Sequence, residues 1–234
     1  MNRSIEPPRR SALLNEALTP IQFSRLLLQA PSLAMAPRGR GERVLVWPGF
    51  GAGNSSTALL RNYLGFLGYQ AKGWKQGNND GDVLNMLDRL KTELIAECRS
   101  EPVSLIGWSL GGYLAREVAR DCPDLVNHVV TLGSPVVGGP KYTAVAGAFT
   151  QTGESMDEIE QLVDARYDTP LRTPVTAIYS KADGVVSWQA CIDERSPNVE
   201  HVEIFSSHMG LGFSPEAYRI LADRLSSAGN SIVR

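Results

Sequence analysis

The pentapeptide Gly107-Trp108-Ser109-Leu110-Gly111 constrains the fold more than any other feature of this chain of 234 residues. A short apolar run at residues 103–106 precedes it, and a helical pattern at residues 110–121 follows it. A serine between a strand and a helix in a Gly-x-Ser-x-Gly pattern is typical of a nucleophile elbow, a strained turn that lifts the hydroxyl group out of a sheet. The pattern therefore predicts a strand–turn–helix unit with a nucleophilic Ser109.

The composition is that of a globular protein with one sizeable core, since 43% of the residues are hydrophobic and 21% are charged. The formal net charge of -2 gives no electrostatic reason to expect a nucleic acid as the partner, so a small molecule is expected. Three cysteines at unrelated spacings argue against a disulfide framework and favour a reducing compartment. No segment reaches the roughly 18 apolar residues of a membrane span, and the first residues do not match a signal peptide. These features predict a cytoplasmic protein without a transmembrane segment, and they leave the oligomeric state open.

Apolar runs that indicate buried strands alternate with helical patterns from residue 44 onward. This alternation predicts an α/β fold, in which helices cover both faces of a mostly parallel sheet. The second helix is expected to bury Leu84, Leu87, Leu94 and Ile95. The predicted strands are residues 44–47, 70–73, 103–106, 128–132, 175–180 and 199–205, and the predicted helices are residues 55–67, 82–98, 110–121 and 215–229.

Two segments stand apart from this alternation. Residues 1–41 are rich in Arg and Pro, with one helical stretch at 21–28, and we interpret them as an N-terminal extension of a domain at 42–234 that packs on the domain or frays. About 40 residues without a strand pattern separate the fourth and fifth predicted strands, with helical patterns at 142–149 and 157–165. An insertion of this kind, at about 139–172, lies where an α/β fold places a lid or a substrate-binding cap, although a surface excursion is the alternative.

A serine nucleophile needs a base, and the chain has three histidines. His128 lies at the start of a predicted strand and His201 lies within the last one, so neither is expected near the carboxyl ends of the strands. His208 follows the last predicted strand, in the loop that precedes the final helix. Because the loops after parallel strands build the catalytic face, His208 is the candidate base.

The base in turn needs an acid that orients it. Asp183 follows the fifth predicted strand in the loop equivalent to that of His208, and the order Ser, Asp, His is the order that this architecture uses. Asp193 and Glu194 lie further downstream, after a stretch that leads away from the catalytic face, and Asp168 lies within the insertion. Asp183 is therefore the candidate acid, with Asp193 as its rival.

An oxyanion intermediate requires two backbone N–H donors. The N–H of Leu110, at the amino end of the helix after the nucleophile, is the first candidate. The second is the N–H of Phe50, in the glycine-rich loop at residues 47–53 that follows the first predicted strand. Both are predictions about backbone groups and not about side chains.

Together, Pro48-Gly49-Phe50-Gly51, the segment Gly107–Gly112, the Asp183 loop and the His208 loop resemble the α/β-hydrolase superfamily, particularly its compact lipase and esterase members. The resemblance spans residues 44–225, or roughly the whole predicted domain. It implies the α/β-hydrolase fold and a triad of Ser109, Asp183 and His208 that acts through an acyl-enzyme. The chain departs from larger members of the family by lacking their leading antiparallel strands, which predicts a minimal sheet of about six strands. Many relatives have His-Gly where this chain has Pro48-Gly49, in the loop that carries the second candidate oxyanion donor.

These features predict a serine hydrolase that cleaves carboxylic esters, with an acyl or alkyl ester as the small-molecule substrate. Trp108 and Met209 are expected to line the substrate pocket. No metal cluster, phosphate loop or dinucleotide fingerprint competes, so no metal and no cofactor are expected. The alternatives are a thioesterase, an amidase or an acyltransferase on the same triad, or a binding protein that keeps this fold without turnover.

Overall fold

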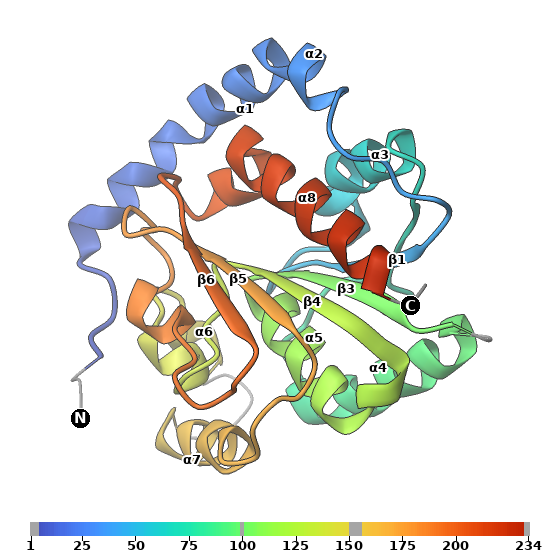
Figure 1. Ribbon diagram of the computed structural model, residues 1–234. Coiled ribbons are helices and arrows are strands. Elements are labelled where there is room, and N and C mark those ends of the chain that lie inside the picture. The colour runs from blue at the N-terminus through green and yellow to red at the C-terminus, as the bar shows by residue number, and fades with distance from the viewer. Residues whose placement is uncertain (1–4, 99–100, 150–155, 232–234) are drawn as a thin grey trace.

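A single parallel sheet organises the molecule (Figure 1). The computed structural model describes residues 5–98, 101–149 and 156–231. The sheet has six strands in the order β2-β1-β3-β4-β5-β6, and each neighbouring pair is parallel. The predicted α/β fold, with a parallel sheet of about six strands, is confirmed. The strands are β1 (Arg43–Trp47), β2 (Gln70–Gly73), β3 (Val103–Trp108), β4 (Val126–Leu132), β5 (Val175–Tyr179) and β6 (Val199–Glu203).

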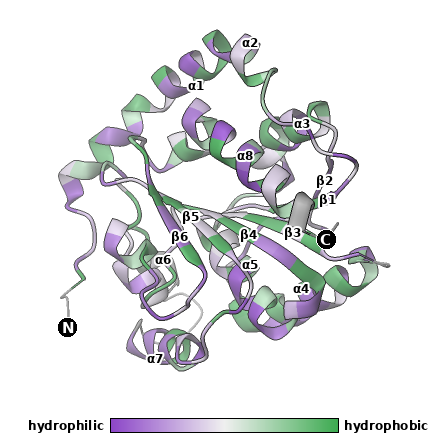
Figure 2. Cartoon of the chain, viewed as in Figure 1, coloured by the Kyte–Doolittle hydropathy of each residue, from purple (hydrophilic) through white to green (hydrophobic). Residues whose placement is uncertain are grey.

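Helices cover both faces of this sheet, and two hydrophobic cores separate it from them. Helices α4 and α5 pack on one face, and α3 and α8 pack on the other. In Figure 2 these helices carry hydrophobic and hydrophilic segments side by side, as expected for helices with one face toward a core and the other toward water. The helices are α3 (Ala58–Phe66), α4 (Val83–Cys98), α5 (Leu110–Asp121) and α8 (Pro215–Ser231), with short 3-10 turns at Asn54–Thr57, Pro123–Leu125, Trp188–Cys191 and Met209–Phe213.

Successive strand residues serve opposite cores because side chains alternate along a strand. In β1, Leu45 and Trp47 belong to the core beneath α4 and α5, whereas Val44 and Val46 belong to the core beneath α8. Because both faces are covered, the central strands β1, β3, β4 and β5 are buried along most of their length, whereas the edge strands β2 and β6 are not. All three cysteines are free thiols.

The buried face of α4 differs from the prediction. Leu87 and Leu94 are buried as expected, but Leu84 and Ile95 are 54% and 62% exposed. The positions that complete the buried face are Met86 and Leu90. The helix carries apolar residues on two faces, and the pattern alone did not indicate which of them packs on the sheet.

The N-terminal extension and the insertion both add helices outside the sheet layers (Figure 1). The extension contains a 3-10 helix, η1 (Arg10–Leu18), followed by α1 (Thr19–Leu28) and α2 (Ala30–Leu33). The insertion contains η4 (Gly139–Tyr142), α6 (Ala146–Phe149) and α7 (Met156–Tyr167). Among the residues that the structure describes, no helix is both long enough and apolar enough to cross a bilayer.

Candidate active site

Ser109 occupies a strained turn between β3 and α5. Its backbone angles are φ 54° and ψ -123°, and it is the one residue other than glycine with a positive φ in the described part of the chain. Its N–H donates a hydrogen bond of 2.8 Å to the carbonyl oxygen of Leu132, at the end of β4. Such strain persists only where the surrounding structure imposes it, and it is frequent at catalytic sites. The turn has the geometry of a nucleophile elbow.

The glycines of the motif allow the backbones around this turn to approach one another. A Cβ atom on Gly107 would lie 2.3 Å from the carbonyl oxygen of Gly111, and one on Gly111 would lie 2.5 Å from that of Pro48. A Cβ atom on Gly49 would lie 3.2 Å from the Cβ of Ser109. Larger residues would therefore push α5 and the loop after β1 away from Ser109.

Asp183 and His208 meet at the carboxyl ends of β5 and β6. The Nδ1 atom of His208 lies 2.7 Å from Oδ2 of Asp183, and both side chains are buried. The other carboxylate oxygen of Asp183 accepts hydrogen bonds from the N–H groups of Val185 and Val186, at 2.8 and 2.7 Å. These contacts fix the carboxylate against Nδ1, so the neutral imidazole carries its proton there and leaves Nε2 as the acceptor.

Gly133, the first residue after β4, makes room for this pair. It has a φ of +55°, and a Cβ atom there would lie 2.9 Å from Oδ2 of Asp183 and 3.2 Å from Nδ1 of His208. A side chain at this position would clash with both members of the pair. The sequence signal for this role is the place of Gly133 directly after a predicted strand, at the start of a loop of small residues.

Opposing influences act on the imidazole of His208. Burial lowers the pKa of His208, but the carboxylates of Asp183 and Glu16 raise it, and the pKa of His208 lies above its ordinary value of 6.5. The protonated form is thus stabilised by two negative charges in a buried site. This is the electrostatic behaviour needed by a base that holds a proton during a reaction.

Glu16, from η1 of the N-terminal extension, joins the two loops that carry this pair. One of its carboxylate oxygens accepts hydrogen bonds from the N–H groups of His208 and Gly184, at 2.9 and 3.2 Å. The other accepts one from the N–H of Met209, at 2.9 Å. No local sequence signal predicts this role of Glu16, because the glutamate lies in a segment far in sequence from both loops.

Asp193, the alternative candidate for the acid, and the other two histidines form contacts away from the pair of Asp183 and His208. Asp193 forms a buried ion pair with Arg116. Burial raises the pKa of Asp193, but the Arg116 guanidinium outweighs this and holds it well below its usual range. His201 accepts a hydrogen bond of 3.0 Å from the N–H of Asp193, and burial lowers the pKa of His128 to about 4. Asp168 forms an ion pair with Arg195. The charged groups that act on His208 are Asp183 and Glu16 instead.

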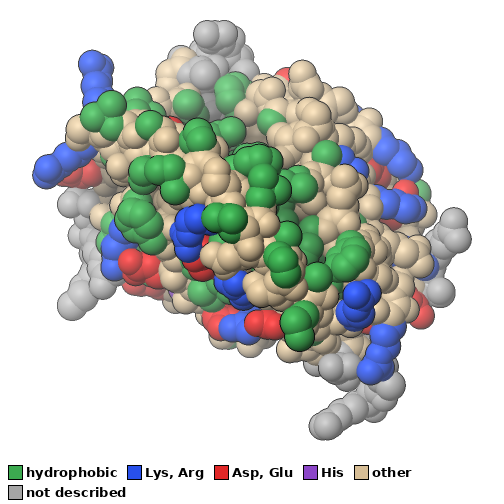
Figure 3. Space-filling view, turned by 90° about the horizontal axis from the view of Figure 1, so that it is seen from above, with side chains coloured by type: hydrophobic (Ala, Val, Ile, Leu, Met, Phe, Trp, Pro, Cys, Tyr) green, Lys and Arg blue, Asp and Glu red, His purple; other side chains and the backbone are tan. Residues whose placement is uncertain are grey.

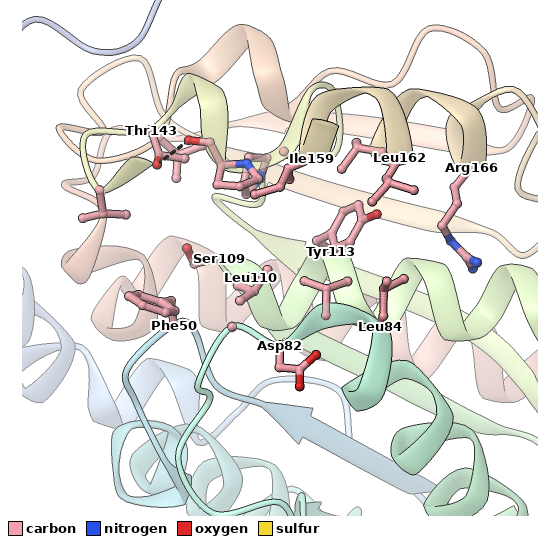
Figure 4. A pocket seen from close by; sticks show the side chains of 18 of the residues that line it. Phe50, Asp82, Leu84, Ser109, Leu110, Tyr113, Thr143, Ile159, Leu162 and Arg166 are labelled. Carbon is pink, nitrogen blue, oxygen red and sulfur yellow. Dashed lines mark hydrogen bonds between the residues drawn. The ribbon is translucent and has the colours of Figure 1, made fainter. Parts of the chain in front are cut away.

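A cavity of about 510 Å³ opens beside Ser109 (Figure 4). Phe50, Ser109 and Leu110 lie together in its wall, which places the two proposed oxyanion donors next to the elbow. Leu110 is the first residue of α5, so its N–H is outside the hydrogen-bond ladder of that helix. The opposite wall comes from α7 of the insertion, through Ile159, Leu162 and Val163.

The cavity is predominantly apolar, and its charged residues are few. Arg166 lies at its edge, where it forms ion pairs with Glu117 and Asp121. Asp82 lies at the amino end of α4, and its carboxylate accepts a hydrogen bond of 2.7 Å from the side chain of Asn85. A cavity of this composition fits an uncharged, largely apolar ligand.

Two predicted pocket residues do not line this cavity. Trp108 is buried in the core on the opposite side of the sheet, against Phe213, and its indole Nε1 donates a hydrogen bond of 3.3 Å to the carbonyl oxygen of His208. Met209 is 46% exposed and lies outside the cavity wall. Alternation along β3 explains the position of Trp108, because its side chain lies on the same face of the sheet as Ile106, away from α5.

The described side chains include no group of three histidine, cysteine or acidic residues placed to hold a metal ion. Ser109 Oγ forms no hydrogen bond with any described residue. The structure therefore brings Asp183 and His208 into contact, and it places Ser109, Leu110 and Phe50 together at the cavity.

Comparisons with known proteins agree with this architecture. A family model described as the alpha/beta hydrolase family matches residues 23–230. The monoacylglycerol lipase of Paleococcus ferrophilus has a similar structure, with a TM-score of 0.65 and 15% identity over 82% of this chain and 97% of that one. An alpha/beta superfamily hydrolase from Oenococcus oeni has a TM-score of 0.62 and 17% identity over 82% and 94% of the two chains. An alpha/beta hydrolase from the metagenome of sediments of the Mar Chica lagoon in Morocco has a TM-score of 0.59 and 19% identity, over 82% of this chain and 94% of that one. No curated protein matches the sequence.

Proposed function

Because the chain belongs to the alpha/beta hydrolase family, we propose that it is a serine hydrolase that cleaves carboxylic esters with Ser109, His208 and Asp183. The observation that carries this proposal is the buried contact of 2.7 Å between His208 and Asp183. It accompanies a serine held in a strained elbow at the wall of an apolar cavity. A strained nucleophile, a base and an acid that orients the base are the three parts that acyl transfer requires.

In the proposed mechanism, Ser109 Oγ attacks the ester carbonyl carbon while Nε2 of His208 accepts the hydroxyl proton. The N–H groups of Leu110 and Phe50 stabilise the oxyanion. His208 then donates the proton to the departing alcohol, which leaves an acyl group on Ser109. Water, deprotonated by His208, attacks the acyl carbon, and His208 then returns the proton to Ser109 Oγ as the bond to the serine breaks and the acid leaves. The contact between Ser109 and His208 forms in the substrate complex, as catalytic hydrogen bonds often do.

The apolar cavity supports an uncharged acyl or alkyl ester as the substrate. The wall supplied by Ile159, Leu162 and Val163 offers no charge to a ligand, and Arg166 is neutralised by its acidic partners. A charged acyl group would lose its hydration there without gaining a counter-ion. A panel of p-nitrophenyl esters and matched thioesters of increasing chain length distinguishes an esterase from a thioesterase.

The proposal is tested by labelling the folded protein with a fluorophosphonate, which transfers its phosphonyl group to an activated serine and releases fluoride. We expect a single adduct on Ser109, none in Ser109→Ala, and labelling about 10³-fold slower in His208→Gln. His201→Gln is the matched control, because His201 lies on the same sheet away from the cavity, and it should keep the wild-type rate. A folded wild-type protein that remains unlabelled would refute the assignment of Ser109.

A further inference from the structure

The outer surface of the N-terminal extension exposes an unusual number of large apolar side chains. Half of the 14 large hydrophobic residues that are exposed in the described chain lie between residues 13 and 35. Figure 3, a view from above, shows hydrophobic side chains gathered over this side of the molecule, with Lys and Arg as well as Asp and Glu side chains among them. These seven residues, which we call the apolar face, are Leu13, Leu14, Ile21, Phe23, Leu27, Leu28 and Met35.

Helix α1 presents apolar residues on both sides. Gln22 and Leu26 are buried against the body of the protein, whereas Leu27 and Leu28 are 56% and 81% exposed. Ile21, two turns before Leu28 and on the same side, is 57% exposed. A helix that packs on a soluble domain normally directs polar residues outward. A contiguous exposed apolar surface instead marks an interaction site.

The charge of the extension indicates what kind of partner this face fits. Residues 1–41 contain six arginines and two glutamates, a formal charge of +4, in a chain whose total is -2. Arg9, Arg10 and Arg40 are exposed and form no ion pair with any described residue. Of the two glutamates, Glu16 is engaged by three backbone N–H groups. The extension therefore carries exposed apolar side chains and a net positive charge in the same segment of the chain.

We propose that this face docks the protein onto an anionic lipid surface, with α1 lying in the interface between headgroups and acyl chains. Leucine, isoleucine and phenylalanine side chains would enter the acyl boundary, and the unpaired arginines would contact anionic headgroups. A second copy of the chain is a poorer occupant, because a symmetric contact would bring two extensions of charge +4 together.

The apolar face continues toward the loop that carries His208. Met209 is 46% exposed and donates its N–H to Glu16, and Phe205, which is 70% exposed, lines a shallow cavity together with Asn15. A docked extension would therefore hold the loop after β6 close to the lipid surface. The proposal does not depend on the proposed hydrolase activity, since binding is measured without turnover.

The test is co-sedimentation of the full chain with sucrose-loaded vesicles. We expect binding to phosphatidylcholine vesicles that contain phosphatidylglycerol, and much weaker binding to phosphatidylcholine alone. Leu28→Glu should weaken the binding about tenfold or more. The double variant Arg9→Gln/Arg10→Gln should weaken binding to the anionic vesicles by a similar factor at low salt, and by a smaller factor at high salt, where charges are screened. Ile95→Glu is the matched control, because Ile95 is an equally apolar helical residue, 62% exposed on α4, and it should bind as wild type does.

Three results would overturn the proposal. The first is that the wild-type protein does not sediment with anionic vesicles. The second is that Leu28→Glu and Ile95→Glu lose vesicle binding to the same extent. The third is a dimer by light scattering that Leu28→Glu dissociates, which would make the apolar face a protein interface. Thermal melting of each variant separates loss of binding from loss of fold, since all four substituted residues are exposed and their replacement should change the melting temperature little.

Discussion

The N-terminal extension and the insertion flank the candidate site from different sides, and they contribute different kinds of contact. The extension reaches the loops after β5 and β6 with polar groups: Asn15 donates to the carbonyl oxygen of Ala182 at 2.9 Å, and Thr19 lies 3.0 Å from the hydroxyl of Ser207. None of its described residues lines the cavity. The insertion supplies the apolar wall of α7.

This difference suggests that the two segments have different roles: one positions the proposed base and acid, and the other shapes the space for the substrate. The extension holds the backbone that carries the base and the acid, so changes in it should affect the rate of the chemical step. The insertion shapes the space for the substrate, so changes in it should affect selectivity between substrates. Both inferences rest on the proposed hydrolase activity.

The largest effect is expected for Glu16→Ala. The substitution removes three hydrogen bonds that join the histidine and aspartate loops, and a displacement of the base by about 1 Å costs on the order of 10²-fold in rate. We expect kcat for a p-nitrophenyl ester to fall by about this factor, with KM nearly unchanged. Glu6→Ala, at an exposed glutamate of the same extension, should keep the wild-type kcat. Equal kinetics in the two variants would mean that the extension does not position the base.

Local patterns predicted the architecture well because each pattern reflects a local physical constraint. Strand β2 and helix α5 have the predicted bounds, since turns rich in glycine and asparagine and the Cys122-Pro123 pair limit them. The contact between Asp183 and His208 followed from two loops at the same edge of a parallel sheet. The catalytic roles of these residues remain predictions.

Contacts between distant segments could not be predicted in the same way. Glu16 and His208 are separated by 192 residues, and no periodicity connects them. The side of the sheet on which Trp108 lies could not be related to the cavity for a different reason. The alternation of side chains along β3 can be read from the sequence, but the sequence does not show which face of the sheet borders the cavity. In α4, two apolar faces compete, and only packing against α5 selects Leu90 over Ile95.

A smaller effect is expected for Leu162→Trp in the insertion. Leu162 is 46% exposed and lines the cavity, so an indole fits there and shortens the space for an acyl chain. Because each methylene in an apolar pocket contributes about 1–3 kcal/mol, kcat/KM for long esters should fall about tenfold relative to short ones. Leu28→Trp, on the extension, should leave the ratio of long to short esters unchanged. If Leu28→Trp also changed the ratio of kcat/KM for long and short esters, the insertion would not be the only one of the two segments that determines chain-length selectivity.

The smallest effect concerns pH. A neutral His208 is needed to accept the serine proton, so kcat/KM should fall as the pH drops through the pKa of His208, which lies above 6.5. The carboxylate of Glu16 is one of the two charges that raise this pKa, the other being Asp183. Glu16→Gln removes a negative charge, so the pKa of His208 should fall and the acidic limb of the profile should move to lower pH. Loss of rate without this movement would show that Glu16 acts on the loops through its hydrogen bonds alone. A movement in the same direction in Glu6→Gln would instead attribute the effect to the general charge of the extension, because Glu6 contacts neither loop.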